Sequence, residues 1–198
     1  ASDVYKRQKL RPTYISVDDP KHFISFCELL DSHLAALLPL HHHELVIVCI
    51  GTDRATGDSL GPLIGYKLTD LDFDHVHVYG NLENPVHAKN LENMTQTLND
   101  HHPNALVIAI DACLGAMENV GSIAIGEGSI KPGAGVQKEL EPIGHLHITG
   151  IVNFSSFMNM VVLQNTRLSL VMKMADIISA GLRHSIWKYY SYKNQRND

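Results

Sequence analysis

The order of apolar and polar residues along the chain alternates between patterns typical of strands and of helices. Two short apolar runs rich in β-branched residues, at 44–50 and 105–112, predict strands that are buried on both faces of a sheet. Weaker segments of this type predict further strands at 75–80, 121–128 and 145–153. Apolar residues recur every three or four positions in the segments predicted to be helices, 18–38, 60–71, 88–101 and 157–186.

These elements follow one another as repeated strand–helix units, which form a parallel sheet with right-handed crossovers and helices on both faces. The sequence therefore predicts an α/β fold, with three α/β/α layers and a mainly parallel central sheet. A chain of 198 residues suits one domain of this kind. We expect an N-terminal tail over 1–18, a single α/β domain over 19–190 and a C-terminal tail over 191–198.

Composition and charge narrow the class of partner. The net charge is −5 and no long basic run occurs, which argues against nucleic acid as a partner. No stretch approaches the ~20 apolar residues of a membrane span and no secretory signal is visible, so we expect a cytoplasmic protein with no membrane partner. The cysteines, Cys27, Cys49 and Cys113, form no CxxC motif, so we expect free thiols and no disulfide.

The turn after the first apolar strand, "IGTDRATGDSLGP" at 50–62, carries the first candidate chemistry. It is rich in glycine, as a phosphate-binding turn is, but it fits neither the P-loop pattern, which has lysine where Asp58 stands, nor the dinucleotide pattern. The carboxylates of Asp53 and Asp58 would repel an anion. The turn is therefore suited to a cation, a water molecule or a neutral polar group such as a peptide.

A second acid, Asp111, follows the other buried strand. Ligands of open parallel sheets bind at the carboxyl ends of the strands, so we expect Asp58 and Asp111 to share one crevice. Neighbouring carboxyls push their pKa values apart, which gives an acid–base pair that can activate water. The same pair supplies two ligands for a divalent metal. Alternatively, Asp58 caps the next helix and Asp53 stabilises its own loop.

Substrate-binding residues are expected in this turn and in the glycine-rich stretch 126–144. A loop of that length in a compact domain is usually functional or mobile, and its backbone N–H groups can hold a peptide or an oxyanion. The alternative is a surface connection without a binding role. The candidates are Asp53, Arg54, Lys131, Gly133 and Gly135.

One histidine and one cysteine are weaker candidates. His147 stands in a strand predicted to run toward the crevice. Cys113 lies two residues beyond Asp111, but a cysteine nucleophile needs a paired base, and the sequence places none beside it. We therefore expect a structural role for Cys113.

Three separated motifs, "GTDRATGDSLGP", "VIAIDACLG" and "IKPGAGV", occur in order and resemble the YyaC-type sporulation proteins of spore-forming bacteria. The resemblance runs from about residue 44 to about residue 186. More distantly, the chain is similar to the spore germination protease and the hydrogenase maturation endopeptidases, which share a three-layer α/β fold. Their site is formed by an acid after the first strand and an aspartate after a later central strand. Those positions match Asp58 and Asp111.

The resemblance implies a peptidase-like domain that hydrolyses a peptide bond of a protein or peptide in the cytoplasm of the developing spore. In the germination protease the matching acids are proposed to act as an atypical aspartic-protease pair. The alternative is a non-catalytic module that binds a peptide or protein in the same crevice. A homo-oligomer is compatible with either function.

In the maturation endopeptidases the two acids and a histidine bind nickel. This chain has Thr52 and Asp53 where those enzymes favour Gly-Asn, and no histidine matches their third ligand. We therefore expect no cofactor and no nickel-specific site, although Asp58 and Asp111 could hold another divalent metal.

Overall fold

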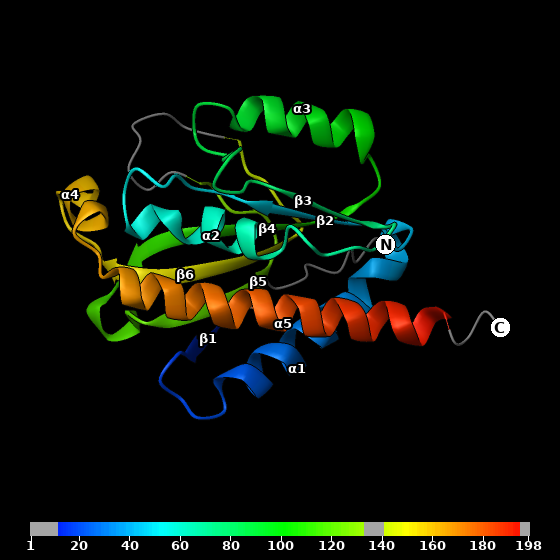
Figure 1. The fold of residues 1–198 in the computed structure, drawn as a ribbon, viewed down its shortest axis with the longest axis horizontal. Coiled ribbons are helices and arrows are strands. Elements are labelled where there is room, and N and C mark those ends of the chain that lie inside the picture. The colour runs from blue at the N-terminus through cyan, green and yellow to red at the C-terminus, as the bar shows by residue number, and fades with distance from the viewer. Residues whose placement is uncertain (1–11, 133–140, 195–198) are drawn as a thin grey trace, which may run out of the picture.

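The computed structural model describes residues 12–132 and 141–194. Its centre is a six-stranded sheet of order β1-β5-β6-β4-β2-β3 (Figure 1). The strands are β1 (Thr13–Ser16), β2 (Leu45–Cys49), β3 (Val76–Tyr79), β4 (Leu106–Gly115), β5 (Ser122–Glu127) and β6 (Leu146–Phe154). Strands β6, β4, β2 and β3 are parallel, and β5 runs antiparallel to both of its neighbours. The predicted α/β fold with a mainly parallel sheet is confirmed.

Helices on both faces of the sheet form the three predicted layers (Figure 1). The α-helices are α1 (His22–Leu37), α2 (Leu60–Lys67), α3 (Leu91–His101), α4 (Asn159–Gln164) and α5 (Leu168–Asn194). Short 3-10 helices occur at η1 (Leu38–His41), η2 (Gly57–Ser59) and η3 (Met117–Asn119). Helices α1, α2 and α5 cover one face, and α3 covers the other.

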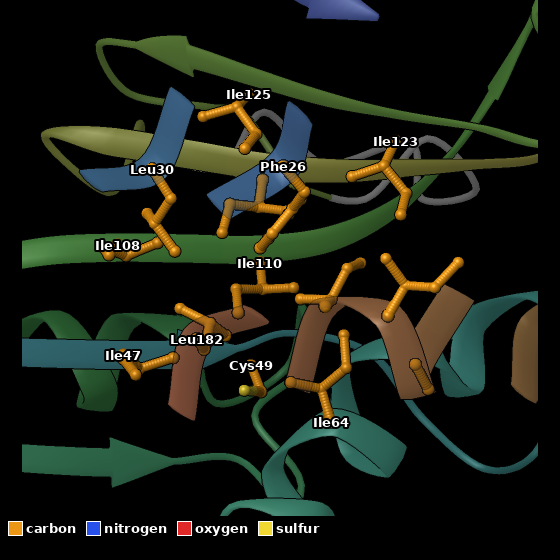
Figure 2. Packing of buried hydrophobic residues seen from close by; sticks show 14 of the residues in the cluster. Phe26, Leu30, Ile47, Cys49, Ile64, Ile108, Ile110, Ile123, Ile125 and Leu182 are labelled. Atoms are coloured by element: carbon orange, nitrogen blue, oxygen red, sulfur yellow. The ribbon is translucent and has the colours of Figure 1, made fainter. Parts of the chain in front are cut away.

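The two faces of the sheet have separate apolar clusters. Because successive strand residues point to opposite faces, β2 sends Ile47 and Cys49 into the larger cluster and Val46 and Val48 into the smaller cluster beneath α3. In the larger cluster, side chains of α1, α2 and α5 pack against β2, β4 and β5 (Figure 2). Each fully buried aliphatic side chain of this kind contributes about 1.5–3 kcal/mol to stability. The sheet is therefore held rigidly between two packed layers.

The structure differs from the expected boundaries at both ends of the domain. Residues 13–16, placed in the N-terminal tail by sequence, form β1 and pair with β5 from Thr13↔Ile125 to Ser16↔Ser122. Only Ile15 of β1 is buried, so its apolar pattern is too short to predict a strand. At the other end, α5 continues to Asn194, into the segment expected as a C-terminal tail.

Residues 22–41, which form α1 and η1, are long and apolar enough to cross a membrane by length and composition. The sequence analysis predicted a helix at 18–38 but stated that no stretch approaches the length of a membrane span. Its residues Phe26, Leu30 and Leu34 lie in the larger core cluster. A core helix has the same length and composition, so this finding gives only weak support for a membrane role.

Candidate active site

The turn between β2 and α2 folds Asp58 back onto the end of β2. The N–H of Thr52 donates to the carbonyl oxygen of Asp58 at 3.0 Å. Gly51 has φ of +142°, and a Cβ there would overlap the same carbonyl oxygen. A Cβ on Gly61 would likewise overlap the carbonyl oxygen of Ile50. These two glycines of the motif are therefore explained by close backbone approach, without a phosphate.

Asp58 does not cap helix α2. The N-cap of α2 is Ser59, whose side chain makes no capping hydrogen bond. Asp58 lies in η2, is half-buried, and its carboxyl is hydrogen-bonded by the backbone of Thr52. The capping role considered from the sequence is therefore absent, and the Asp58 carboxyl is left facing the pocket described below.

Asp111 lies in β4 at the level where β2 ends. Cys49, the last residue of β2, pairs with Ile110, and Asp111 is the next residue of β4. Strand β4 continues beyond this point because it stays paired with β6, so Asp111 lies within the strand and not just after it. Asp111 shares a strand face with Ala109, is 8% exposed, and accepts a hydrogen bond from the N–H of Ala112 at 2.8 Å.

Asp58 and Asp111 line the same pocket, which has a volume of about 510 Å³. The β2–α2 turn, the loop before α3, β4 and helix α4 supply its lining residues. The pocket lies at the carboxyl ends of β2 and β4, as expected for a ligand site of a parallel sheet. The fold therefore brings the two acids to one concave site.

The other candidate residues are placed differently. Asp53 and Arg54 are exposed and line the pocket, so both are positioned to contact a bound molecule. Lys131 is exposed and is not a lining residue, although its neighbour Pro132 is one. Gly133 and Gly135 lie outside the described residues.

His87 is a pocket residue that the sequence analysis missed. It stands in the loop before α3, lines the pocket, and its charge acts on Asp58. Its Nδ1 atom is buried and has no hydrogen-bond partner among the described residues. The loop that carries His87 has no hydrophobic periodicity, and its approach to Asp58 is a contact between distant segments. No local signal in the sequence reports such a contact.

Burial raises the pKa of the Asp58 carboxyl. The hydrogen bond from Thr52 and the charge of His87 both act in the opposite direction. The sequence analysis expected repulsion between two carboxylates to separate their pKa values, but the main cause at Asp58 is burial. A raised pKa favours the protonated carboxyl, which is the form that a general acid needs.

His147 and Cys113 are not among the lining residues of this pocket. The Nδ1 atom of His147 is hydrogen-bonded to the carbonyl oxygen of Gly128 at 3.0 Å, so its strand does not carry it into the crevice. Burial and the charge of Asp111 raise the pKa of Cys113 to about 11, which keeps this thiol protonated near neutral pH. Cys27, Cys49 and Cys113 are all free, as predicted.

The resemblance to the maturation endopeptidases implies a nickel ion held by two acids and a histidine. Asp58, Asp111 and His87 supply these donor types in one pocket. Within residues 12–132 and 141–194, however, they do not form a group whose donor atoms all lie within 4.8 Å of one another. Their arrangement does not fit a preformed nickel cage, so no catalytic step is derived through a metal. Binding of another divalent ion by Asp58 and Asp111 stays a prediction.

The sheet and its covering helices define an α/β protein with the fold of a hydrogenase maturation protease. The structure is similar to that of the [NiFe] hydrogenase maturation protease HycI from Thermococcus kodakarensis KOD1, with a TM-score of 0.53 and 16% sequence identity. The match covers 80% of this chain and 98% of that chain. At this identity the likeness shows the fold alone.

The chain belongs to the family described as "Protein of unknown function (DUF1256)", which matches residues 14–181. It is also similar to a protein of Bacillus subtilis (strain 168) with the name "Uncharacterized protein YyaC". The two are 57% identical over 138 residues, which make up 70% of this chain and 67% of that protein. The resemblance to the YyaC-type proteins, drawn from three motifs, is confirmed.

Proposed function

We propose that the protein is a peptidase-like hydrolase that cleaves a peptide bond in a protein or peptide with Asp58 and Asp111. One observation carries the proposal: the carboxyls of Asp58, in η2 after β2, and of Asp111, within the neighbouring β4, line one pocket. The similarity to a maturation protease supports a peptidase-like fold. The assignment of chemistry to the two acids rests on the pocket.

The raised pKa of Asp58 suits it to act as the acid, and Asp111 then acts as the base. Asp111 takes a proton from water as the water oxygen bonds to the peptide carbonyl carbon. Asp58 gives its proton to the carbonyl oxygen. When the C–N bond breaks, Asp111 gives the proton it took from water to the leaving nitrogen, and a hydroxyl of the tetrahedral intermediate returns a proton to Asp58 as the carbonyl reforms. The products are one carboxyl group and one amine, and the two acids end with the protons they began with.

Exposed apolar side chains beside the pocket support a protein or peptide as substrate. We define the α4 patch as Phe154, Phe157, Met158, Met160 and Val161, all of them exposed. Phe157 is 98% exposed, and Met160 is 47% exposed and lines the pocket. Exposed apolar residues concentrated in one segment are typical of interaction sites. A peptide chain that lies across the pocket would cover some of them.

The test is cleavage of a peptide library made from a digested proteome, with new termini identified by mass spectrometry. We expect Asp58→Asn and Asp111→Asn to lower the rate by at least about 100-fold, and the double variant to lose little more, because the pair acts as a unit. Asp72→Asn makes the same chemical change at an exposed position outside the pocket lining and serves as the control. Full activity in Asp58→Asn would contradict the proposal.

The α4 patch also favours a second candidate, a non-catalytic module that binds a peptide or protein in the same pocket. In that case the library peptides bind but remain intact, and Asp58→Asn binds them as the unaltered protein does. Equilibrium binding and cleavage measured on one sample separate the two functions.

Place of action and assembly are also part of the proposal. The YyaC-type resemblance supports the cytoplasm of the developing spore, and a fluorescent fusion that appears only outside that compartment would contradict it. A homo-oligomer is proposed as well, and light scattering that gives the mass of one 22.0 kDa chain would exclude it.

A further inference from the structure

A second cluster of polar side chains lies at the end of the sheet opposite the pocket. Glu44 directly precedes β2, His77 is the second residue of β3, and His102 follows the last residue of α3. The cluster therefore lies at the amino ends of the parallel strands, whereas Asp58 and Asp111 lie at their carboxyl ends. It takes no part in the function proposed above.

The donor atoms of the three side chains converge. The Oε1 atom of Glu44 lies 2.6 Å from Nδ1 of His102 and 3.7 Å from Nε2 of His77. The two imidazole rings are tilted by 39°, with centroids 4.4 Å apart. One donor atom from each residue lies within 4.8 Å of the other two. Ligands about 2.0–2.2 Å from one zinc ion lie roughly 3–3.5 Å apart, so small rotations of these side chains would complete a site.

The burial of the three side chains suits an ion site with a route to solvent. The His102 side chain is 8% exposed, whereas those of Glu44 and His77 are 26% and 38% exposed. His102 is therefore fixed in place, and the other two can adjust and admit an ion. Two imidazoles and one carboxylate form a donor set typical of zinc, with water as a fourth ligand.

Tyr79 holds the imidazole of His102 in position, on the side of the ring away from Glu44. Its hydroxyl lies 2.8 Å from Nε2 of His102, and the rings meet edge to face with centroids 5.7 Å apart. An imidazole that binds a metal through one nitrogen carries its proton on the other and donates it to a neighbouring oxygen. The Tyr79 hydroxyl is placed to accept that hydrogen bond, which makes Tyr79 a positioning residue.

We propose that Glu44, His77 and His102 bind one Zn²⁺ ion. The ion would join three segments that are adjacent in space, since β3 is the edge strand of the sheet and α3 lies on one face. Because the folded protein presents the three ligands together, zinc binding stabilises the folded state. The site would hold the edge strand and α3 against β2.

The test uses the full chain without a histidine tag, stripped with a chelator and then given one equivalent of Zn²⁺. We expect zinc to be retained through gel filtration at one ion per chain and to raise the melting temperature. We expect His77→Gln and Glu44→Gln each to lower zinc affinity at least tenfold, and Tyr79→Phe to lower it about tenfold or more. His101→Gln, at the exposed neighbour of His102, and Asp58→Asn should bind zinc as the unaltered protein does.

Co²⁺ gives a second readout that does not depend on stability. Visible absorption typical of four-coordinate Co²⁺ should appear in the unaltered protein and be lost in His77→Gln. If circular dichroism shows that His77→Gln is misfolded, Glu44→Gln decides the question. Failure of the unaltered protein to retain zinc would show that Glu44 and His102 form only a hydrogen-bonded pair. Loss of zinc in Asp58→Asn with retention in His77→Gln would place the ion in the pocket, and either result would overturn the proposal.

Discussion

The imidazole of His87, in the loop before α3, and the carboxyl of Asp58, in η2, come from separate segments, and the charge of His87 lowers the pKa of Asp58 against the effect of burial. Removing that charge should therefore raise the pKa of Asp58. We expect His87→Gln to shift the titration of the Asp58 carboxyl, followed by carbon-13 NMR, to higher pH. The Asp58→Asn spectrum identifies the resonance.

His101→Gln is the control for this experiment, because His101 is exposed and lies at the end of α3. If His87→Gln left the titration of Asp58 unchanged or moved it to lower pH, the two groups would not interact as the structure indicates.

The raised pKa of Asp58 predicts how stability depends on pH. The folded state holds the Asp58 proton more tightly than the unfolded state, whose carboxyl has a pKa of about 3.9. Stability is therefore lost as pH rises from that value through the folded pKa, and the loss is complete above it. Asp58→Asn removes this loss, so it should raise the melting temperature at pH 7. The gain should shrink to zero below about pH 3.9.

Thermal melts of Asp58→Asn across this pH range, with Asp72→Asn beside them, measure the effect. A gain in Asp72→Asn of the same size would assign it to net charge and not to burial of Asp58.

Gly51 is expected to tolerate no side chain. In Gly51→Ala an alanine would have to adopt φ of +142°, and its Cβ would overlap the carbonyl oxygen of Asp58. The free-energy costs of backbone strain and of steric overlap therefore add. We expect a loss of roughly 3 kcal/mol or more in the free energy of unfolding. Gly128 is the matched control, since its φ is +100° and a Cβ there would meet nothing within 4 Å. Gly128→Ala should cost only about 1–2 kcal/mol, measured by urea unfolding.

The thiols should differ sharply in reactivity between folded and unfolded protein. Unfolded, unreduced protein should give three free thiols on titration, since all three cysteines are free. In the folded protein Cys49 is fully buried and burial raises its pKa, so it should not react. Labelling of Cys113 should be slow at pH 7 and should accelerate as pH approaches about 11. Fast labelling of Cys113 at pH 7 would contradict its structural role.

Strands whose burial is encoded locally could be predicted from the sequence. The apolar runs of β2 and β4 are buried on both faces. A short apolar run rich in β-branched residues predicts a buried strand from its own composition. Strand β1 was missed because it buries a single residue, Ile15, at the edge of the sheet. Its pairing with β5 is set by tertiary structure, which local pattern does not report.

The polar sites also divide into those that local sequence predicts and those that depend on tertiary structure. Asp58 and Asp111 could be predicted to share a pocket because each follows an apolar run that predicts a buried strand, and parallel strand ends share one edge of a sheet. His87 stands in an irregular loop. Glu44, His77 and His102 lie in three different segments, and the sequence analysis gave their histidines no role. Their convergence depends on the strand order and on the packing of α3, neither of which can be derived from spacing along the chain.

The packing of α1 against α5 constrains how the chain can fold during its synthesis (Figure 1). Thr13 of β1 pairs with Ile125 of β5, so the first described strand has no partner until more than a hundred further residues have left the ribosome. Helix α1 lacks its neighbour α5 for even longer, because α5 is the last described element to be synthesised. Until then the part of α1 that packs against α5 stays exposed, so we expect chaperones to bind nascent chains halted before α5.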